Sequence, residues 1–562
     1  MNLQPRPSSN SRKRWLWMVP FLGLLIAAAP LRENYFELSK QLEIMTAMFR
    51  ELNIYYVDEI QPGELMEAGM DAMVSSLDPY TVYYPESRIE DLRFMTTGEY
   101  GGIGASIQFI NDRHLFVDVL PDFPAARAGL KIGDELTHVD GQPLLEVNPD
   151  LVSELLQGAS GTEVIIKYIP NGASETTELS IEREKIKLPA VPFRSVVADS
   201  TGYVILRAFT RGCSFELRQA IRYLQDSTDV NQLVLDLRGN GGGLLQESIS
   251  IVNLFVPKGE EVVSTRGKKE EWLKSYKTMA DPLVPDWPVA VLIDEQSASA
   301  SEIVAGTLQD LDRAIIVGQE SFGKGLVQQT KPLAYGTKLK VTVAKYYTAS
   351  GRCIQRLDYG GKRSAEGVAQ AFADSTLQSF KTRNGRPVID GKGVQPDVPV
   401  DLPYMGYVLE GLYMNGTLFD FANAWSAQHD SIGPAKDFHL SEVDWQAFVQ
   451  FAKDSESTTF ESRTQTAWSE LTALAREEQI YSLDSTAFDA FSQVLEPSIE
   501  RDLNRFKEEI TWALEEELVM RYHLQTGVIE WSIPRDNPLN KAIELMSTNR
   551  HLDILAGPTF TE

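Results

Sequence analysis

The spacing of hydrophobic residues changes several times along the chain. From residue 35 to 95, apolar residues recur at intervals of three and four, which predicts helices. From 98 to 184, glycines and short strand-like runs predict a small β-rich domain with one helix over 149–157. The predicted strands of this domain cover 114–120, 134–140 and 162–169.

Residues 185–400 alternate predicted strands with predicted helices, which indicates an α/β layer architecture. The strands cover 202–209, 231–237, 288–294, 314–318 and 338–347, and the helices cover 215–226, 244–255 and 299–310. From 401 onward the pattern is mostly helical, with an amphipathic run over 505–524. Our default interpretation of residues 401–562 is a solvated helical appendage.

The first 34 residues have the pattern of an export segment. Three basic residues at 12–14 precede a 15-residue apolar run over 15–29. As a helix this run spans about 22 Å, less than the ~30 Å of a bilayer core. Pro30 directly follows the small residues of a signal-peptidase site and should hinder cleavage. We therefore expect export with an uncleaved anchor, hence a periplasmic protein held at the inner membrane. A buried core helix is the alternative.

Charge and cysteine content narrow the function classes. The 562 residues carry 79 acidic and 53 basic side chains, a net charge of −26, so a nucleic-acid partner is not expected. Residues 401–562 hold 28 acids and 11 bases, or −17 of that charge, which marks them as a separate acidic unit. Two cysteines are too few for a disulfide framework or a thiolate zinc site.

Two predicted strands of the α/β region each end in a loop suited to chemistry. The strand over 231–237 leads into Arg-Gly-Asn-Gly-Gly-Gly (238–243), whose backbone N–H groups could hold an oxyanion or serve a plain tight turn. The strand over 288–294 leads into Ser-Ala-Ser-Ala-Ser-Glu (297–302) at a helix start. A serine at such an elbow is a good nucleophile position, and N-capping is the alternative role.

A base for this serine cannot come from a nearby histidine, because no histidine lies between residues 139 and 428. Lys324, in Ser-Phe-Gly-Lys-Gly (321–325), is the better candidate. A lysine acts as a base only if burial lowers its pKa from about 10.4. Gln328, four residues on, could orient the amine without adding charge. Taken alone, a lysine in this position is more often a solvated surface lysine than a base.

Together these motifs resemble one known family. The segments SSLDPYTVYYP, YGGIGA, PAARAGLKIGDEL, LVLDLRGNGGG, SASASEIVAGTLQD, GQESFGKGLVQQ and DGKGVQPDV are similar to those of the carboxy-terminal processing proteases, which are PDZ-containing Ser-Lys peptidases of the S41 type. The resemblance covers about residues 35–400. It implies a multidomain α/β protein with a ClpP/crotonase-like protease core over 185–400 and an inserted PDZ domain over 98–184. An N-terminal helical region over 35–97 and an acidic helical C-terminal domain over 401–562 complete the expected organisation.

The resemblance also implies roles for particular residues. The serine 25 positions before the lysine becomes the nucleophile, Ser299, with Lys324 as general base and Gln328 as its orienting amide. The oxyanion donors become the N–H of Ala300 and that of a glycine in 241–243, either Gly242 or Gly243. No metal or cofactor is implied.

In the PDZ domain, the resemblance places the terminal carboxylate of a bound peptide at the glycine-rich segment that starts at Tyr100. A hairpin turn is the alternative use of these glycines. The expected peptide-binding residues are Gly101, Gly102, Ile103 and Gly104.

The sequence therefore predicts an exported serine endopeptidase that binds apolar C-terminal tails of proteins and cleaves peptide bonds with a Ser-Lys dyad. A non-catalytic PDZ scaffold is the second hypothesis. A third, a His-dependent esterase, would need His114 or His138 beside Ser299. The physiological substrate, and whether the C-terminal domain forms a homo-oligomer, are left open.

Overall fold

The computed structural model describes residues 35–557 except 146, 199, 365–366, 402–404, 456–459, 461 and 497. The predicted signal or anchor segment, residues 1–34, lies outside the described residues. The chain divides into two compact units, one ending at Tyr83 and one beginning at Tyr84. The first unit holds a helix over 35–55 and α2 (Pro62–Ser75), as the periodicity predicts. Within the described part of the chain, none of the helices combines the length and apolarity needed to cross a bilayer.

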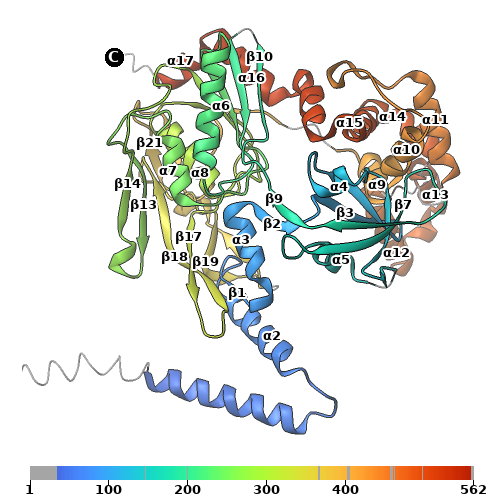
Figure 1. Cartoon of the computed structure of the whole chain (residues 1–562), viewed down its shortest axis with the longest axis horizontal. Coiled ribbons are helices and arrows are strands. Elements are labelled where there is room, and N and C mark those ends of the chain that lie inside the picture. The colour runs from blue at the N-terminus through green and yellow to red at the C-terminus, as the bar shows by residue number, and fades with distance from the viewer. Residues whose placement is uncertain are drawn as a thin grey trace, which may run out of the picture. The chain divides into compact units, whose positions relative to one another are not determined.

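The second unit contains a six-stranded sheet, whose first strand, β10, is labelled in Figure 1. Its strand order is β10-β11-β12-β15-β16-β23, and all neighbours are parallel except β10 and β11. The middle strands are apolar runs buried on both faces, as expected for a parallel sheet between helices. The strands are β10 (Phe193–Ala198), β11 (Thr201–Ile205), β12 (Gln232–Asp236), β15 (Val289–Ile293), β16 (Ile315–Gly318) and β23 (Val398–Pro399).

Helices cover both faces of this sheet. One face packs against α6 (Cys213–Ser227), α7 (Leu245–Val252) and α8 (Ala300–Asp310). The other face packs against α16 (Asn537–Ser547), through Leu539, Ala542, Leu545 and Met546, with α17 (Arg550–Leu555) beside it. Residues 537–555 are therefore part of the core around the α/β sheet.

A second, antiparallel sheet in the same region has the order β17-β18-β13-β14. Its strands are β13 (Glu261–Gly267), β14 (Lys274–Lys277), β17 (Leu326–Pro332) and β18 (Lys338–Thr348). Short strands follow: β19 (Leu357–Arg363), β20 (Ala369–Ala371), β21 (Ser379–Lys381) and β22 (Pro387–Ile389). The sequence predicted only β18 of this group.

The β-rich domain is an antiparallel sheet in the order β3-β4-β5-β7-β8, which leaves β3 at an edge. The alternating inward residues of its strands form a separate hydrophobic core. Its elements are β3 (Ala105–Ile110), β4 (Arg113–Val119), α4 (Pro124–Arg127), β5 (Glu135–Val139), β6 (Gln142–Pro143), α5 (Pro149–Leu156), β7 (Glu163–Ile169) and β8 (Thr177–Glu182). The ribbon of β2 (Glu99–Gly102) and β9 (Glu184–Lys187) connects it to the rest, after α3 (Ile89–Thr97).

The C-terminal region is not the solvated appendage that the sequence suggested. Its helices bury their own core, which includes Trp445 and Phe448. Phe419 inserts into the core of the β-rich domain, where Asp420 also pairs with Arg113 at 2.6 Å. The helices are α9 (Tyr407–Met414), α10 (Thr417–Ser426), α11 (Glu442–Asp454), α12 (Arg463–Glu477), α13 (Ser485–Leu495), α14 (Ile499–Arg505) and α15 (Lys507–Ser532). The apolar faces of these helices pack this region against the β-rich domain. The net charge of the region does not reveal these faces.

Candidate active site

The elbow between β15 and α8 contains three serines, and one of them has a side chain that solvent can reach. The hydroxyls of Ser297 and Ser301 are buried and donate to the backbone carbonyls of Leu237 and Asn240, at 2.8 Å each. Ser299 is partly exposed and has φ 55° and ψ −108°, a conformation that costs a non-glycine residue roughly 1–3 kcal/mol. This backbone turns the chain sharply between strand and helix, so Ser299 occupies the position of a strained nucleophile elbow.

The glycine loop after β12 lies directly against this elbow. A Cβ on Gly242 would lie 2.8 Å from the nitrogen of Ala300 and 2.9 Å from the Cβ of Ser299, so only glycine permits this approach. The N–H of Gly242 donates to the side chain of Asn240 at 2.9 Å. Among the hydrogen bonds of the described residues, the N–H groups of Gly243 and Ala300 are donors in none. Of the two predicted glycines, it is therefore Gly243 whose N–H no described residue accepts.

A buried carboxylate joins Ser299 to Lys324. Glu302 is fully buried in the first turn of α8. Its Oε2 accepts hydrogen bonds from the backbone N–H of Ser299 at 2.7 Å and from that of Lys324 at 2.9 Å. Its Oε1 accepts from the hydroxyl of Ser321 at 2.6 Å and from the N–H of Gly323 at 2.7 Å. Two residues 25 positions apart are thus held on one oxygen atom.

The hydroxyl of Tyr346 on β18 makes a second connection. It lies 3.0 Å from the carbonyl oxygen of Ser299 and 2.7 Å from that of Lys324. The Tyr346 side chain is buried, so this hydroxyl can donate to either carbonyl without competition from bulk water. Lys324 itself is only partly buried.

Neither Glu302 nor Tyr346 was predicted from the sequence as a residue of the site. Glu302 stands three positions after Ser299, and this Ser-x-x-Glu spacing is the signature of a capping box, which could have identified it. Tyr346 has no comparable signal, because only the pairing of β18 beside β17 brings it to the site.

Burial raises the pKa of Glu302, and the four hydrogen bonds oppose this effect by favouring the carboxylate.

The conservative substitution Glu302→Gln should be damaging. A glutamine amide that turns its NH₂ group toward the N–H groups of Ser299 and Lys324 loses both hydrogen bonds. One that turns it toward Ser321 and Gly323 loses the bond from the Gly323 N–H, because the Ser321 hydroxyl can rotate to accept. Each hydrogen bond to a charged group contributes about 1.5–3 kcal/mol. We expect thermal denaturation to show a loss of roughly 1.5 kcal/mol or more, and kcat/KM to fall at least about tenfold. Glu295→Gln, at an exposed glutamate of the same elbow, is the control and should match the wild type. Equal Tm and kcat/KM in both variants would refute the role of Glu302.

Gln328 lies on β17 opposite Thr342, and its side-chain amide donates to the hydroxyl of Thr342 at 3.3 Å.

The two histidines of the esterase hypothesis lie in the β-rich domain. His114 is buried with Nε2 3.2 Å from the carbonyl of Leu144, and Nδ1 of His138 lies 3.1 Å from the hydroxyl of Thr137. No group of three His, Cys, Asp or Glu side chains in the described ranges is arranged to hold a metal ion.

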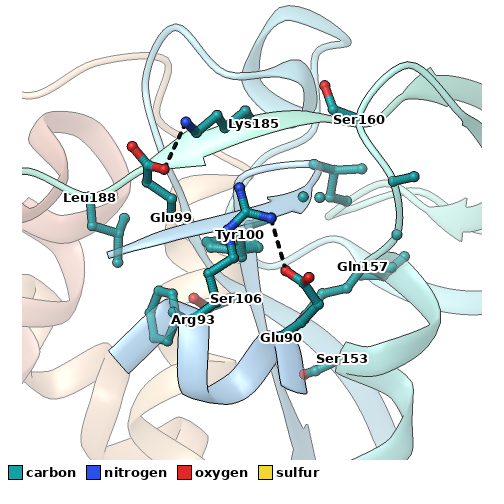
Figure 2. Close-up of a pocket in the computed structure, with 18 of the residues that line it drawn as sticks. Glu90, Arg93, Glu99, Tyr100, Ser106, Ser153, Gln157, Ser160, Lys185 and Leu188 are labelled. Carbon is teal, nitrogen blue, oxygen red and sulfur yellow. Dashed lines mark hydrogen bonds and ion pairs between the residues drawn. The ribbon is translucent and has the colours of Figure 1, made fainter. Parts of the chain in front are cut away.

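A groove of about 740 Å³ opens beside the edge strand of the β-rich domain (Figure 2). Gly101, Gly102 and Ile103 line it, together with residues of α5 and α3. A Cβ on Gly101 would lie 2.0 Å from the carbonyl of Gly158, so the backbone approaches too closely for any other residue. Gly101 and Gly102 therefore belong to a strand, β2, and not to a hairpin turn. Gly104, at φ 78°, packs against Phe123 and does not line the groove.

The groove has an apolar wall and a charged rim. The ring of Phe94 on α3 meets that of Tyr100 edge-on at 5.6 Å. On the rim, Arg93 pairs with Glu90 at 3.3 Å and Lys185 pairs with Glu99 at 2.7 Å (Figure 2). An unpaired edge strand beside an apolar groove suits an extended peptide that adds as a further strand.

Comparison with known proteins assigns the chain to a family. The sequence profile of peptidase family S41 matches residues 200–361, and that of the PDZ domain matches 115–169. A carboxy-terminal-processing protease of Bartonella bacilliformis is 37% identical over 319 residues, which cover 56% of this chain and 73% of that protein. This chain belongs to peptidase family S41. A probable CtpA-like serine protease of Staphylococcus aureus is 30% identical over 408 residues, covering 70% of this chain and 73% of its own length.

Three matching sequence profiles confirm the predicted fold class: a protease core, a PDZ domain and a helical C-terminal region. The acidic C-terminal region also has a counterpart in known proteases: the profile of a probable PDZ-protease C-terminal helical domain matches residues 408–546. A solved photosystem II D1 C-terminal processing protease is 27% identical, with 65% of this chain and 93% of that chain covered and a TM-score of 0.36. The profiles and the two curated relatives therefore place the protein in the carboxy-terminal processing family of serine proteases, with a PDZ domain.

Proposed function

We propose that this S41 protein is an exported endopeptidase that cleaves with a Ser299–Lys324 dyad. The observation that carries the proposal is the shared support of the two residues: one oxygen of Glu302 accepts both backbone N–H groups. The Tyr346 hydroxyl reaches both backbone carbonyls. A pair fixed on both sides of its backbone is held for a joint task, since catalytic groups must keep their geometry to a fraction of an ångström.

In the proposed reaction the neutral Lys324 amine takes the proton of the Ser299 hydroxyl while the serine oxygen attacks the scissile carbonyl. The tetrahedral oxyanion is stabilised by the N–H groups of Ala300 and Gly243, at the start of α8 and in the glycine loop. The lysine then gives its proton to the leaving amine, and water hydrolyses the acyl-enzyme. Gln328 is proposed to orient the amine.

The substrate is proposed to enter through its C-terminus. The groove beside β3 offers an apolar wall for the terminal side chains, and the backbone at Gly101, Gly102 and Ile103 is proposed to receive the carboxylate. The basic and apolar pattern of residues 1–34 supports export with a membrane anchor.

A carrier protein with a short unstructured tail tests the proposal. Purified protein is incubated with the carrier ending in Leu-Ala-Ala and, as a matched control, in Leu-Asp-Asp, and products are followed by mass spectrometry. We expect internal cleavage of the apolar-tailed carrier and at least about tenfold slower cleavage of the acidic one. Binding of the apolar tail with no cleavage would replace the proposal by the scaffold hypothesis. Equal cleavage of both carriers would remove the role assigned to the groove.

A further inference from the structure

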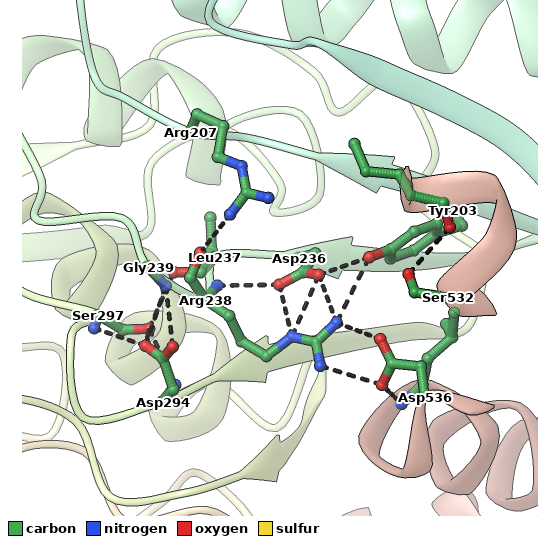
Figure 3. A network of polar contacts seen from close by, with 12 residues as sticks. Tyr203, Arg207, Asp236, Leu237, Arg238, Gly239, Asp294, Ser297, Ser532 and Asp536 are labelled. Atoms are coloured by element: carbon green, nitrogen blue, oxygen red, sulfur yellow. Dashed lines mark hydrogen bonds and ion pairs between the residues drawn. The ribbon is translucent and has the colours of Figure 1, made fainter. Parts of the chain in front are cut away.

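Arg238 opens the glycine loop, and two carboxylates hold its guanidinium (Figure 3). Asp236, at the end of β12, accepts from Nε at 3.0 Å and from Nη2 at 2.7 Å. Asp536 accepts from Nη1 at 3.0 Å and from Nη2 at 2.6 Å. Side-chain exposure is 19% for Arg238 and 13% for Asp536, so this pair is largely shielded from solvent. Such two-pronged ion pairs fix direction as well as distance.

The charges of this cluster depend on one another. Burial by itself would raise the pKa of Asp236, but Arg238 and a hydrogen bond from Tyr203 hold that pKa below its usual value. Burial would lower the pKa of Arg238, and the two aspartates raise it instead. One guanidinium between two carboxylates leaves the cluster with one net negative charge, so removal of the Asp536 charge would leave Arg238 neutralised by Asp236 but held from one side only.

The position of Arg238 sets the path of the loop beside the nucleophile. The next residue, Gly239, donates its N–H to both carboxylate oxygens of Asp294 at 3.0 Å. The carbonyl of Asn240 then accepts from the N–H of Ala298 at 3.0 Å, inside the serine elbow. Gly243 lies only five residues after Arg238, so a shift of the arginine backbone shifts the loop glycines relative to Ser299.

Asp536 comes from the C-terminal region, 298 residues away in sequence. It is the N-cap of α16, where its side chain accepts from the N–H of Leu539 at 3.0 Å. We propose that Asp536 is a positioning residue for the oxyanion loop and acts through Arg238. The C-terminal helices would then complete the catalytic centre. This inference rests on the proposed dyad mechanism.

The substitution Asp536→Asn separates the two tasks of this side chain. Asparagine caps a helix about as well as aspartate, so α16 keeps its cap while the negative charge on Arg238 is lost. We expect kcat to fall about 10–100-fold with KM within about twofold, less than the ~10²–10³-fold loss from deleting an oxyanion donor. A peptide aldehyde, which adds to Ser299 as a tetrahedral adduct, should lose affinity by the same factor. Binding of the Leu-Ala-Ala tail should not change.

Asp484→Asn is the matched control, since Asp484 caps α13 of the same region through the N–H of Ala487. It should leave kcat and aldehyde affinity at wild-type values. An Asp536→Asn protein that folds with wild-type kcat and aldehyde affinity would overturn the inference. So would one that fails to fold, because Asp536 would then serve the fold and not the loop. A wild-type protein that neither cleaves nor binds the aldehyde would instead refute the dyad mechanism.

Discussion

Substitution of Ser299 by alanine is expected to abolish cleavage of the apolar-tailed carrier, with kcat reduced roughly 10⁴–10⁶-fold, the range seen when a catalytic serine is removed. No neighbouring hydroxyl can replace it, because those of Ser297 and Ser301 are buried and bonded to backbone carbonyls. Alanine has the same aversion to φ 55° as serine, so the strain at the elbow is unchanged. Thermal denaturation should therefore show a Tm close to that of the wild type.

Ser297→Ala provides the control with the opposite profile. It removes two hydrogen bonds of the hydroxyl, one donated to the carbonyl of Leu237 and one accepted from the N–H of Asp294, each worth about 1 kcal/mol, and leaves the nucleophile in place. Its Tm should fall while kcat stays within about tenfold of the wild type. Full activity in Ser299→Ala would refute the assignment of the nucleophile.

Replacement of Lys324 by arginine should be nearly as severe. The guanidinium keeps the positive charge but cannot act as a base, because its pKa exceeds 12. We expect at least about a 10³-fold loss of kcat, the scale of general-base catalysis combined with loss of an activated nucleophile. Single-turnover cleavage measured from pH 6 to 10 should show no recovery in Lys324→Arg. The wild-type rate should rise with pH as the lysine loses its proton.

A matched substitution lies nearby on β18. Lys345 pairs with Leu326, and Leu326 is two residues after Lys324 in the sequence. Lys345→Arg therefore makes the same chemical change close to the dyad without altering it. It should keep wild-type kinetics. Lys324→Arg with more than about a tenth of wild-type kcat would exclude the lysine as general base.

The sequence predicted the α/β core well because its signals are local. The strand expected at 231–237 is β12 (Gln232–Asp236), and the helix expected over 215–226 is α6 (Cys213–Ser227). A fully buried strand needs a continuous apolar run, and an amphipathic helix needs a 3.6-residue repeat. Both patterns lie within the segment itself, so they can be recognised without knowing what the segment packs against. The strand ends then place both chemical loops at one edge of the sheet.

What the sequence could not predict depends on long-range contacts. Tyr346 reaches the site only through the pairing of β18, and Asp536 meets Arg238 from 298 residues away. The acidic C-terminal region looked solvated because charge dominates its composition, yet its apolar faces pack on the α/β sheet and the PDZ domain. Composition reports what a segment contains and not which face it turns inward.

Chemical rescue of Lys324→Cys tests the dyad most directly. The cysteine variant should be inactive, and alkylation with 2-bromoethylamine should rebuild a lysine-like amine at that position, which is partly exposed to reagent. Wild-type protein treated in the same way controls for Cys213 and Cys353. We expect cleavage to return to at least about a tenth of the wild-type rate, with a pH profile shifted to lower pH because the thioether makes the new amine less basic. Stoichiometric alkylation of residue 324 with no return of cleavage, or full activity before alkylation, would contradict it.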